Sequence, residues 1–229
     1  MNKFNVQKQM IETVAKALDE LIDQVVFIGG CTTGLLVTDS FTQEQIRYTD
    51  DVDLIIDIAS NAQWIALQQK LRDKGFTESM EDDVICRFRL GELKVDFMPT
   101  DENILGFSNR WYPEAISKAV DYQLTENLII KLISPEYFVA TKLEAYHGRG
   151  NGDILGSHDL EDLLNIFDGR SGIIIDIKTA EEGVKEYIRN ELASLQEEND
   201  FEYLVKATAN NDTAREELIF QRIETCLND

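Results

Sequence analysis

The chain of 229 residues carries 43 acidic and 22 basic side chains, which give a formal net charge of −21. Such a charge repels bulk polyanions, so it excludes a broad nucleic-acid-binding surface while leaving room for a local basic pocket. Hydrophobic residues make up 43% of the chain. That share is sufficient for a real core in one large domain or two small ones.

Cysteine, histidine and hydropathy patterns exclude further classes of protein. Cys31, Cys86 and Cys226 are widely spaced and odd in number, so they form neither a disulfide framework nor a zinc-ligand motif. Two histidines exclude a histidine-rich metal site. No apolar run approaches the ~20 residues that span a bilayer, and the first ten residues lack the apolar segment of a signal peptide. We expect a reduced cytoplasmic protein without membrane contact.

The first distinctive stretch is a short apolar strand, Val25–Ile28, that ends in the pair Gly29-Gly30. Two glycines at a strand end allow backbone N–H groups to approach an anion closely. By themselves, however, they are more typical of a tight turn without a ligand. The other elements expected nearby are a helix over residues 6–23, a helical turn over 31–37 and an exposed loop over 40–45.

The next predicted strand, residues 51–58, alternates acidic and apolar side chains. Asp51, Asp53 and Asp57 fall on one face, and residues two apart in a strand lie ~6.5 Å from each other. Two carboxylates at that spacing can share divalent cations, and two metal ions ~3.5–4 Å apart suit in-line displacement at phosphorus. The alternative is a solvated edge strand, which fits poorly because acidic residues are depleted in strands.

A β-hairpin is predicted from Val84–Leu90 and Leu93–Met98, because Gly91-Glu92 suits a two-residue type II′ turn. That register places Arg87 opposite Asp96. Two interpretations stand: Asp96 is a third carboxylate of a site, or it forms an ordinary cross-strand ion pair with Arg87. Between the two motifs we expect a helix over residues 61–74, a strand over 76–80 and an acidic turn over 81–83.

The second half of the chain is predicted to be mostly helical, after a helix over 111–120 and a strand over 128–133. Ser134-Pro135 opens a helix, with Ser as N-cap and Pro at the first helical position. Lys142 lies on the mixed face of this helix, where a solvated lysine is the commoner explanation. Ser157 is expected to cap a helix over 158–167, and Asp159 and Asp162 suit its N-terminal turns. Residues 173–177 break the helical pattern, and acidic amphipathic helices are expected over 179–198 and 212–227.

Taken in order, these motifs resemble the nucleotidyltransferase superfamily of DNA polymerase β. In that superfamily a Gly-Gly or Gly-Ser turn holds the triphosphate, and three carboxylates on a small mixed sheet bind metal ions. The segment SPEYFVATKLEAYHGRG…HDLEDLLNIF looks like the bacterial nucleotidyltransferase toxins of abortive-infection and type IV toxin–antitoxin systems. The triplet Arg47-Tyr48-Thr49 before the aspartates also fits. The resemblance covers roughly residues 20–168.

The resemblance implies an α+β fold, in which a small mixed β-sheet nucleotidyltransferase core flanked by helices spans residues 1–133. An α-helical C-terminal region over 134–229 would complete the active site and form an acidic tail. The implied metal ligands for Mg²⁺ or Mn²⁺ are Asp51, Asp53 and Asp96, with Asp96 also as the general base. The implied contacts to the NTP are Gly29, Gly30, Thr32, Arg47 and Lys142, and Asp159 would position nearby groups.

The implied reaction moves a nucleoside monophosphate from an NTP to a hydroxyl and releases pyrophosphate. The toxin resemblance suggests a tRNA 3′ end as acceptor and an antitoxin as partner. Two alternatives stand: transfer to a small cationic molecule such as an aminoglycoside, and a non-catalytic nucleotide-binding or partner-binding protein of the same fold. Three departures bear on the acceptor. Cys31 replaces a serine, twenty residues separate Gly30 from Asp51, and His158 replaces a lysine.

Overall fold

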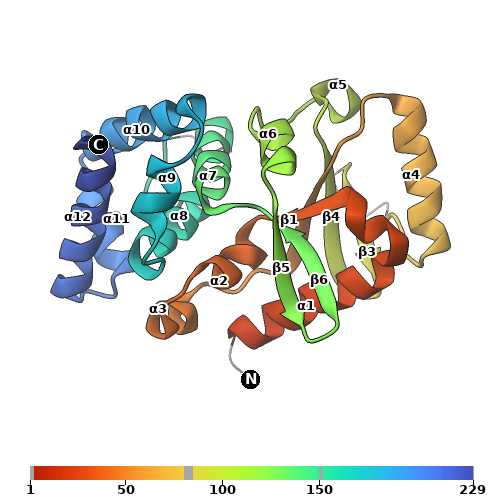
Figure 1. The fold of residues 1–229 in the computed structure, drawn as a ribbon, viewed down its shortest axis with the longest axis horizontal. Helices are drawn as coiled ribbons and strands as arrows, with labels where there is room; N and C mark the ends of the chain where they lie inside the picture. Colours follow the sequence, from red (N-terminus) through yellow and green to blue (C-terminus); the bar gives the residue numbers. More distant parts are fainter. Residues whose placement is uncertain (1–2, 80–84, 150–151, 229) are drawn as a thin grey trace. The chain divides into compact units, whose positions relative to one another are not determined.

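The computed structural model describes residues 3–79, 85–149 and 152–228 (Figure 1). The chain divides into two compact units. The first, the sheet unit, contains residues 1–32 and 47–134; the second, the helical unit, contains residues 33–46 and 135–229. This division falls beside the expected boundary at 133/134. The segment 33–46, however, groups with the helical unit, although its neighbours on both sides in the sequence belong to the sheet unit.

The sheet unit is built on a mixed sheet of six described strands in the order β3-β4-β2-β1-β6-β5. β1 pairs antiparallel with β2 and parallel with β6, whereas β2 pairs parallel with β4. β3–β4 and β5–β6 are antiparallel hairpins. The strands are β1 (Val25–Ile28), β2 (Asp51–Ile56), β3 (Arg87–Leu90), β4 (Leu93–Pro99), β5 (Val120–Thr125) and β6 (Leu128–Leu132).

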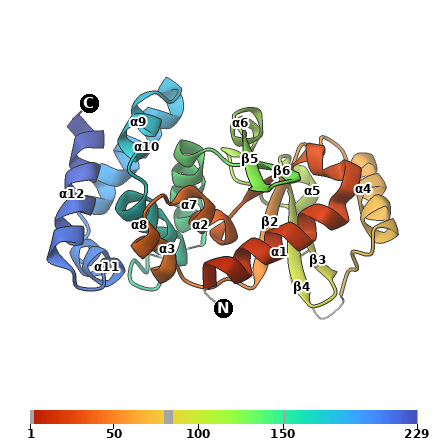
Figure 2. The ribbon, with the colours of Figure 1, turned by 60° about the horizontal axis from the view of Figure 1, so that its bottom comes forward.

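One face of this sheet is closed by aromatic packing. In the hairpin, Phe88 lies opposite Val95, and Phe97 follows on the same face of β4. The rings of Phe88 and Phe97 meet edge to face at 5.5 Å, and Trp64 from α4 (Asn61–Asp73) packs on Phe88 at 6.4 Å. α4 therefore covers this face on the side of β3 (Figures 1 and 2). The opposite face of the same strands is left to the polar residues of the hairpin and of β2.

The sheet unit also contains α1 (Lys3–Leu18), which buries Met10, Ile11, Val14 and Leu18 at helical spacing. The shorter helical segments of this unit are η1 (Asp19–Gln24), η2 (Gly30–Thr32), α5 (Glu102–Leu105) and α6 (Tyr112–Ser117). The N-terminal helix was predicted to run to residue 23, but it changes to 3₁₀ geometry at Asp19, whose φ is 51°.

The helical unit is organised around α8 (His158–Gly169), against which α2, α3, α7, α11 and α12 pack. As predicted, the Ser157 hydroxyl caps α8 by accepting a hydrogen bond from the Leu160 N–H at 3.2 Å. The other helices of this unit are α2 (Thr33–Leu36), α3 (Ser40–Gln45), α7 (Pro135–Arg149), α9 (Ile173–Lys178), α10 (Glu182–Gln196), α11 (Phe201–Thr208) and α12 (Thr213–Asn228).

The hairpin register and the strand at Val25–Ile28 are confirmed, and two local predictions are wrong. Ser40–Gln45 is helix α3, not a loop, because Asp39 caps it by accepting a hydrogen bond from the Thr42 N–H. Ile173–Lys178 is helix α9. The helix predicted over 111–120 is present as α6, which ends at Ser117, and strand β5 begins at Val120.

Two further predictions concern the segment after α4. The strand predicted over 76–80 is reduced, among the described residues, to a single bridge between Thr77 and Arg89. The acidic turn predicted over 81–83 lies outside the described residues. None of the described helices combines the length and the apolar character that crossing a membrane requires.

Candidate functional site

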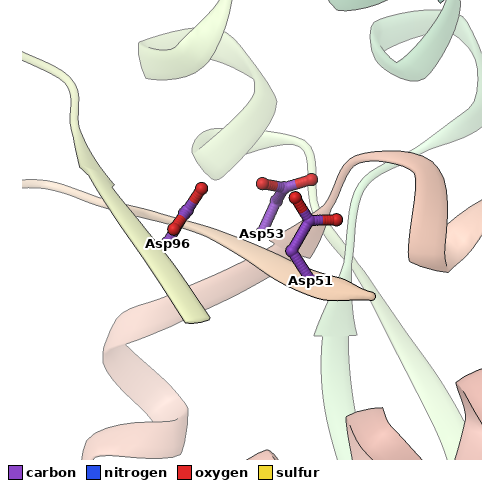
Figure 3. A group of neighbouring side chains, drawn as sticks. All are labelled: Asp51, Asp53 and Asp96. Carbon is purple, nitrogen blue, oxygen red and sulfur yellow. The ribbon is translucent and has the colours of Figure 1, made fainter. Parts of the chain in front are cut away.

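The candidate site lies on one row of side chains that crosses four neighbouring strands. Arg87 on β3 pairs with Asp96 on β4, Asp96 pairs with Asp53 on β2, and Asp53 pairs with Ile28 on β1. Side chains of directly paired residues project from the same face of a sheet. Asp51 lies two residues before Asp53 and shares that face. Figure 3 shows the three carboxylates on the same side of β2 and β4.

The three aspartates form a cluster that suits a divalent cation. Asp51, Asp53 and Asp96 each offer a carboxylate oxygen, and these oxygens all lie within 4.8 Å of one another. Asp96 is buried, and Asp51 is partly exposed. Hard cations such as Mg²⁺ bind oxygen ligands, typically one or two carboxylates together with substrate phosphates. The donor set therefore fits Mg²⁺ or Mn²⁺, and the cluster is more exposed to solvent at Asp51 than at Asp96.

Gly29 brings the glycine turn directly against this cluster. Its φ is 75°, in the left-handed region, and a Cβ placed on it would lie 1.8 Å from Oδ2 of Asp53. No other residue type fits at this position, because any side chain would overlap the carboxylate. The Gly29 carbonyl accepts hydrogen bonds from the Thr32 N–H at 3.1 Å and from Thr32 Oγ1 at 2.8 Å. The turn and Asp53 therefore form a single packed feature.

Two neighbouring side chains donate hydrogen bonds to the cluster. Arg87 donates to both oxygens of Asp96, at 2.8 Å from Nε and 2.7 Å from Nη2, and Nη2 also lies 3.5 Å from Oδ2 of Asp51. The Thr49 hydroxyl donates to Oδ1 of Asp51. The predicted pairing of Asp96 with Arg87 is therefore confirmed, and Asp96 also lies in the carboxylate cluster. Its role in a functional site stays a prediction.

The cluster also affects the thiol group of Cys86. Burial, followed by the charges of Asp96 and Asp53, raises the pKa of the Cys86 thiol to about 12. Asp50, one residue before the strand, is in a different environment. It is exposed and accepts a hydrogen bond from Lys94 at 2.8 Å, which lowers the pKa of its carboxyl. Asp50 therefore forms an ion pair with Lys94 and lies outside the cluster.

Lys142 and Asp159, which the sequence placed in the site, lie together in the helical unit. Lys142 Nζ donates to Oδ1 of Asp159 at 3.0 Å and to Oδ2 of Asp162 at 2.7 Å. Their side chains are 7%, 9% and 0% exposed, so this is a buried ion-pair triad. Asp162 was not among the predicted site residues. Its spacing of three from Asp159 could have indicated that both acids share one face of the helix. The catalytic roles of Lys142 and Asp159 stay predictions.

The predicted phosphate contacts are distributed around the glycine turn and the start of β2. Gly30 and Thr32 are buried within η2. The backbone carbonyl of Arg47 accepts a hydrogen bond from Gln7 Nε2 at 3.3 Å, which attaches the segment before β2 to α1. The binding of a triphosphate by Gly29, Gly30, Thr32 and Arg47 stays a prediction.

Comparison with known proteins shows likeness in structure but none in sequence. No protein-family model matches the sequence, and no curated protein matches it. The fold is similar to the solution structure of the antibiotic-resistance factor ANT(2'')-Ia, with 18% identity and a TM-score of 0.46, over 86% of this chain and 97% of that one. At this TM-score the likeness assigns no activity to the chain. It also gives no support to the expected toxin resemblance.

Proposed function

We propose that the chain is a metal-dependent nucleotidyltransferase that moves a nucleoside monophosphate from an NTP to a hydroxyl group of a small cationic molecule. The observation that carries the proposal is the carboxylate cluster against the glycine turn. Asp51, Asp53 and Asp96 gather their oxygens within 4.8 Å, and Gly29 lies in contact with Asp53. Carboxylates that hold divalent cations beside a site for phosphates are the arrangement that phosphoryl-type transfer requires.

Different residues of the sheet unit would bind the metal ion and the triphosphate. Asp51 and Asp53 would hold the metal from one strand, and Asp96 would do so from the next. When bound, Mg²⁺ or Mn²⁺ neutralises charge on the transferring phosphate. The turn at Gly29-Gly30 would take the triphosphate, since a residue without a side chain lets phosphate oxygens approach the backbone.

The bond changes in the proposed reaction are those of a simple displacement. The acceptor oxygen forms a bond to the α-phosphorus, the bond from that phosphorus to the bridging oxygen breaks, and pyrophosphate leaves. The acceptor proton passes to a base, and Asp96 is the carboxylate proposed for this role. Both of its oxygens accept a hydrogen bond from Arg87, and a carboxylate offers about four lone-pair sites.

The charge of the chain favours a cationic acceptor over a nucleic acid. With 43 acidic and 22 basic residues, the protein attracts polyamine-like molecules and repels long polyanions. Affinity for nucleic acid depends on neutralising many phosphates, which a net charge of −21 opposes. A polyhydroxylated polycation such as an aminoglycoside has both the charge and the nucleophile that the proposal needs. The tRNA 3′ end remains the competing acceptor.

The experiment is transfer of label from each α-³²P-labelled NTP, with Mg²⁺ or Mn²⁺, to a panel of aminoglycosides or to total tRNA. We expect label on an aminoglycoside, with stoichiometric release of pyrophosphate and no transfer in EDTA. Asp53→Asn is the inactive reference. Asp57→Asn is the matched control, since Asp57 follows the same strand and its carboxylate accepts a hydrogen bond from Thr100 instead.

The possible outcomes separate the candidate functions. Label on tRNA alone would retain nucleotidyl transfer and overturn the cationic acceptor. Binding of NTP and metal without transfer to any acceptor would favour the non-catalytic alternative. Calorimetry with ATP and Mg²⁺ on the wild type and on Asp53→Asn would identify that case.

A further inference from the structure

Arg87 on β3 contacts two acids of the carboxylate cluster, Asp96 and Asp51, and these two contacts differ in length. Its two donors to Asp96 lie at 2.8 and 2.7 Å, within the range of strong charge-assisted hydrogen bonds. Its contact with Asp51 is 3.5 Å long. The guanidinium is therefore firmly held by Asp96 and weakly held by Asp51.

The three carboxylates of the cluster carry more negative charge than the Arg87 guanidinium alone can offset. Three carboxylates face one guanidinium, and the Arg87 side chain is only 16% exposed. A guanidinium keeps its proton at every relevant pH, so its charge cannot be removed when a metal ion arrives. A divalent ion that binds Asp51, Asp53 and Asp96 must therefore enter beside a permanent positive charge.

We propose that Arg87 is the cluster's built-in counter-ion, and that a divalent ion binds by replacing it at Asp51 while Arg87 stays on Asp96. This inference rests on the proposed metal-dependent function and adds a positioning residue to it. In the absence of metal, Arg87 lowers the repulsion among the three carboxylates. In the presence of metal, its charge weakens the binding of the ion. The exchange occurs at Asp51, because that contact is the longer one and Asp51 is the more exposed acid.

The inference predicts two effects of opposite sign for Arg87→Gln. The unfolding temperature measured in EDTA falls, because three carboxylates are left without their guanidinium. The affinity for Mn²⁺ rises on the order of tenfold, because a positive charge close to the ion has been removed. An arginine with a purely structural role would lower the unfolding temperature while leaving Mn²⁺ binding unchanged or weaker.

The experiment is calorimetric titration of the full chain with Mn²⁺ alone, together with thermal unfolding in EDTA and in saturating Mn²⁺. Arg87→Lys keeps the charge and loses the two-donor fork, so its Mn²⁺ affinity should stay within about threefold of wild type if charge is what matters. Arg89→Gln is the matched control on the same strand. It lies opposite Lys94 in the register, and its affinity should equal that of the wild type.

The results distinguish failure of this inference from failure of the proposed function. Unchanged or weaker Mn²⁺ binding by Arg87→Gln overturns the counter-ion role while leaving the metal site in place. Absence of Mn²⁺ binding in the wild type and in Arg87→Gln overturns the metal site itself. If Arg87→Gln is unfolded in EDTA, it should fold when Mn²⁺ is added. A variant that stays unfolded with Mn²⁺ also contradicts the inference, because the ion then fails to offset the repulsion among the three carboxylates.

Discussion

Two groups of aspartates, one in each unit, differ in the arginines that contact them and in their exposure to solvent. In the sheet unit, Arg87 donates two hydrogen bonds to Asp96, and Thr49 donates one to Asp51. In the helical unit, Asp168 accepts hydrogen bonds from Thr42 at 2.6 Å and from Arg215 at 2.7 and 2.6 Å, and its side chain is 4% exposed.

The helical group is completed by Asp39, which accepts from the Thr42 N–H and from Arg215 at 2.8 Å each. Arg215 on α12 therefore ties α8 to the segment that carries α3, and the C-terminal helices belong to the core of their unit. Carboxylates whose oxygens accept several hydrogen bonds from the protein stabilise the fold. Carboxylates that outnumber the nearby cations are the ones suited to bind an external cation.

The largest expected effect separates these two groups by activity. Asp53→Asn should lower nucleotidyl transfer by about 10³-fold, because it removes a charged ligand from the proposed metal site. Asp168→Asn should leave the rate of the folded protein within about twofold while lowering its stability by about 2 kcal/mol. Initial rates of transfer and urea unfolding of both variants provide the measurements. Equal loss of rate in both would contradict the distinction.

The next effect concerns the buried triad of the helical unit. Lys142→Met should lower the free energy of unfolding by about 3–5 kcal/mol, since it leaves two buried carboxylates without their cation. Both acids are less than one-tenth exposed. Urea denaturation checks this. A variant as stable as the wild type but unable to transfer nucleotide would instead support the catalytic role that the family resemblance implies for Lys142.

A smaller effect is expected where the turn meets Asp53. Gly29→Ala should reduce transfer about 10²-fold and destabilise the chain by about 1–3 kcal/mol, because the new methyl group overlaps Oδ2 of Asp53 and the backbone is left-handed. Gly75→Ala is the control. Gly75 has a φ of 88°, but a Cβ there would meet nothing within 4 Å. It should cost stability and leave the rate unchanged.

The smallest effect is a pH dependence in the helical unit. The Thr42 N–H, and then Arg215, lower the pKa of Asp39 from 3.8 to about 2. A carboxyl whose folded pKa is depressed contributes stability above its unfolded value, and this is lost as pH falls from about 4 to 2. Because the Asp39 side chain is 43% exposed, we expect no more than about 1 kcal/mol. Asp39→Asn should make the free energy of unfolding less dependent on pH over that range. An unchanged pH profile would contradict the assignment.

The elements that could be predicted are those with a local signal. The register of the hairpin follows from Gly91-Glu92 and from alternation, and it correctly placed Arg87 opposite Asp96. α3 was missed because five of its six residues are polar and because its cap, Asp39, is equally common in loops. β5 was missed although Val120, Tyr122 and Leu124 alternate with polar residues, because Val120 was assigned to the preceding helix.

The sequence by itself determined the local parts of the candidate site. Strand alternation puts Asp51 and Asp53 on one face, and the turn chemistry of the hairpin brings Arg87 to Asp96. Only the tertiary structure decided that β2 pairs parallel with β4 so that Asp53 and Asp96 meet, since no turn specifies that register. The tertiary structure also decided which aspartates form ion pairs with arginine, because Arg215 and Asp39 are 176 residues apart in the chain. Contacts over such separations depend on packing of the whole unit, which local patterns do not encode.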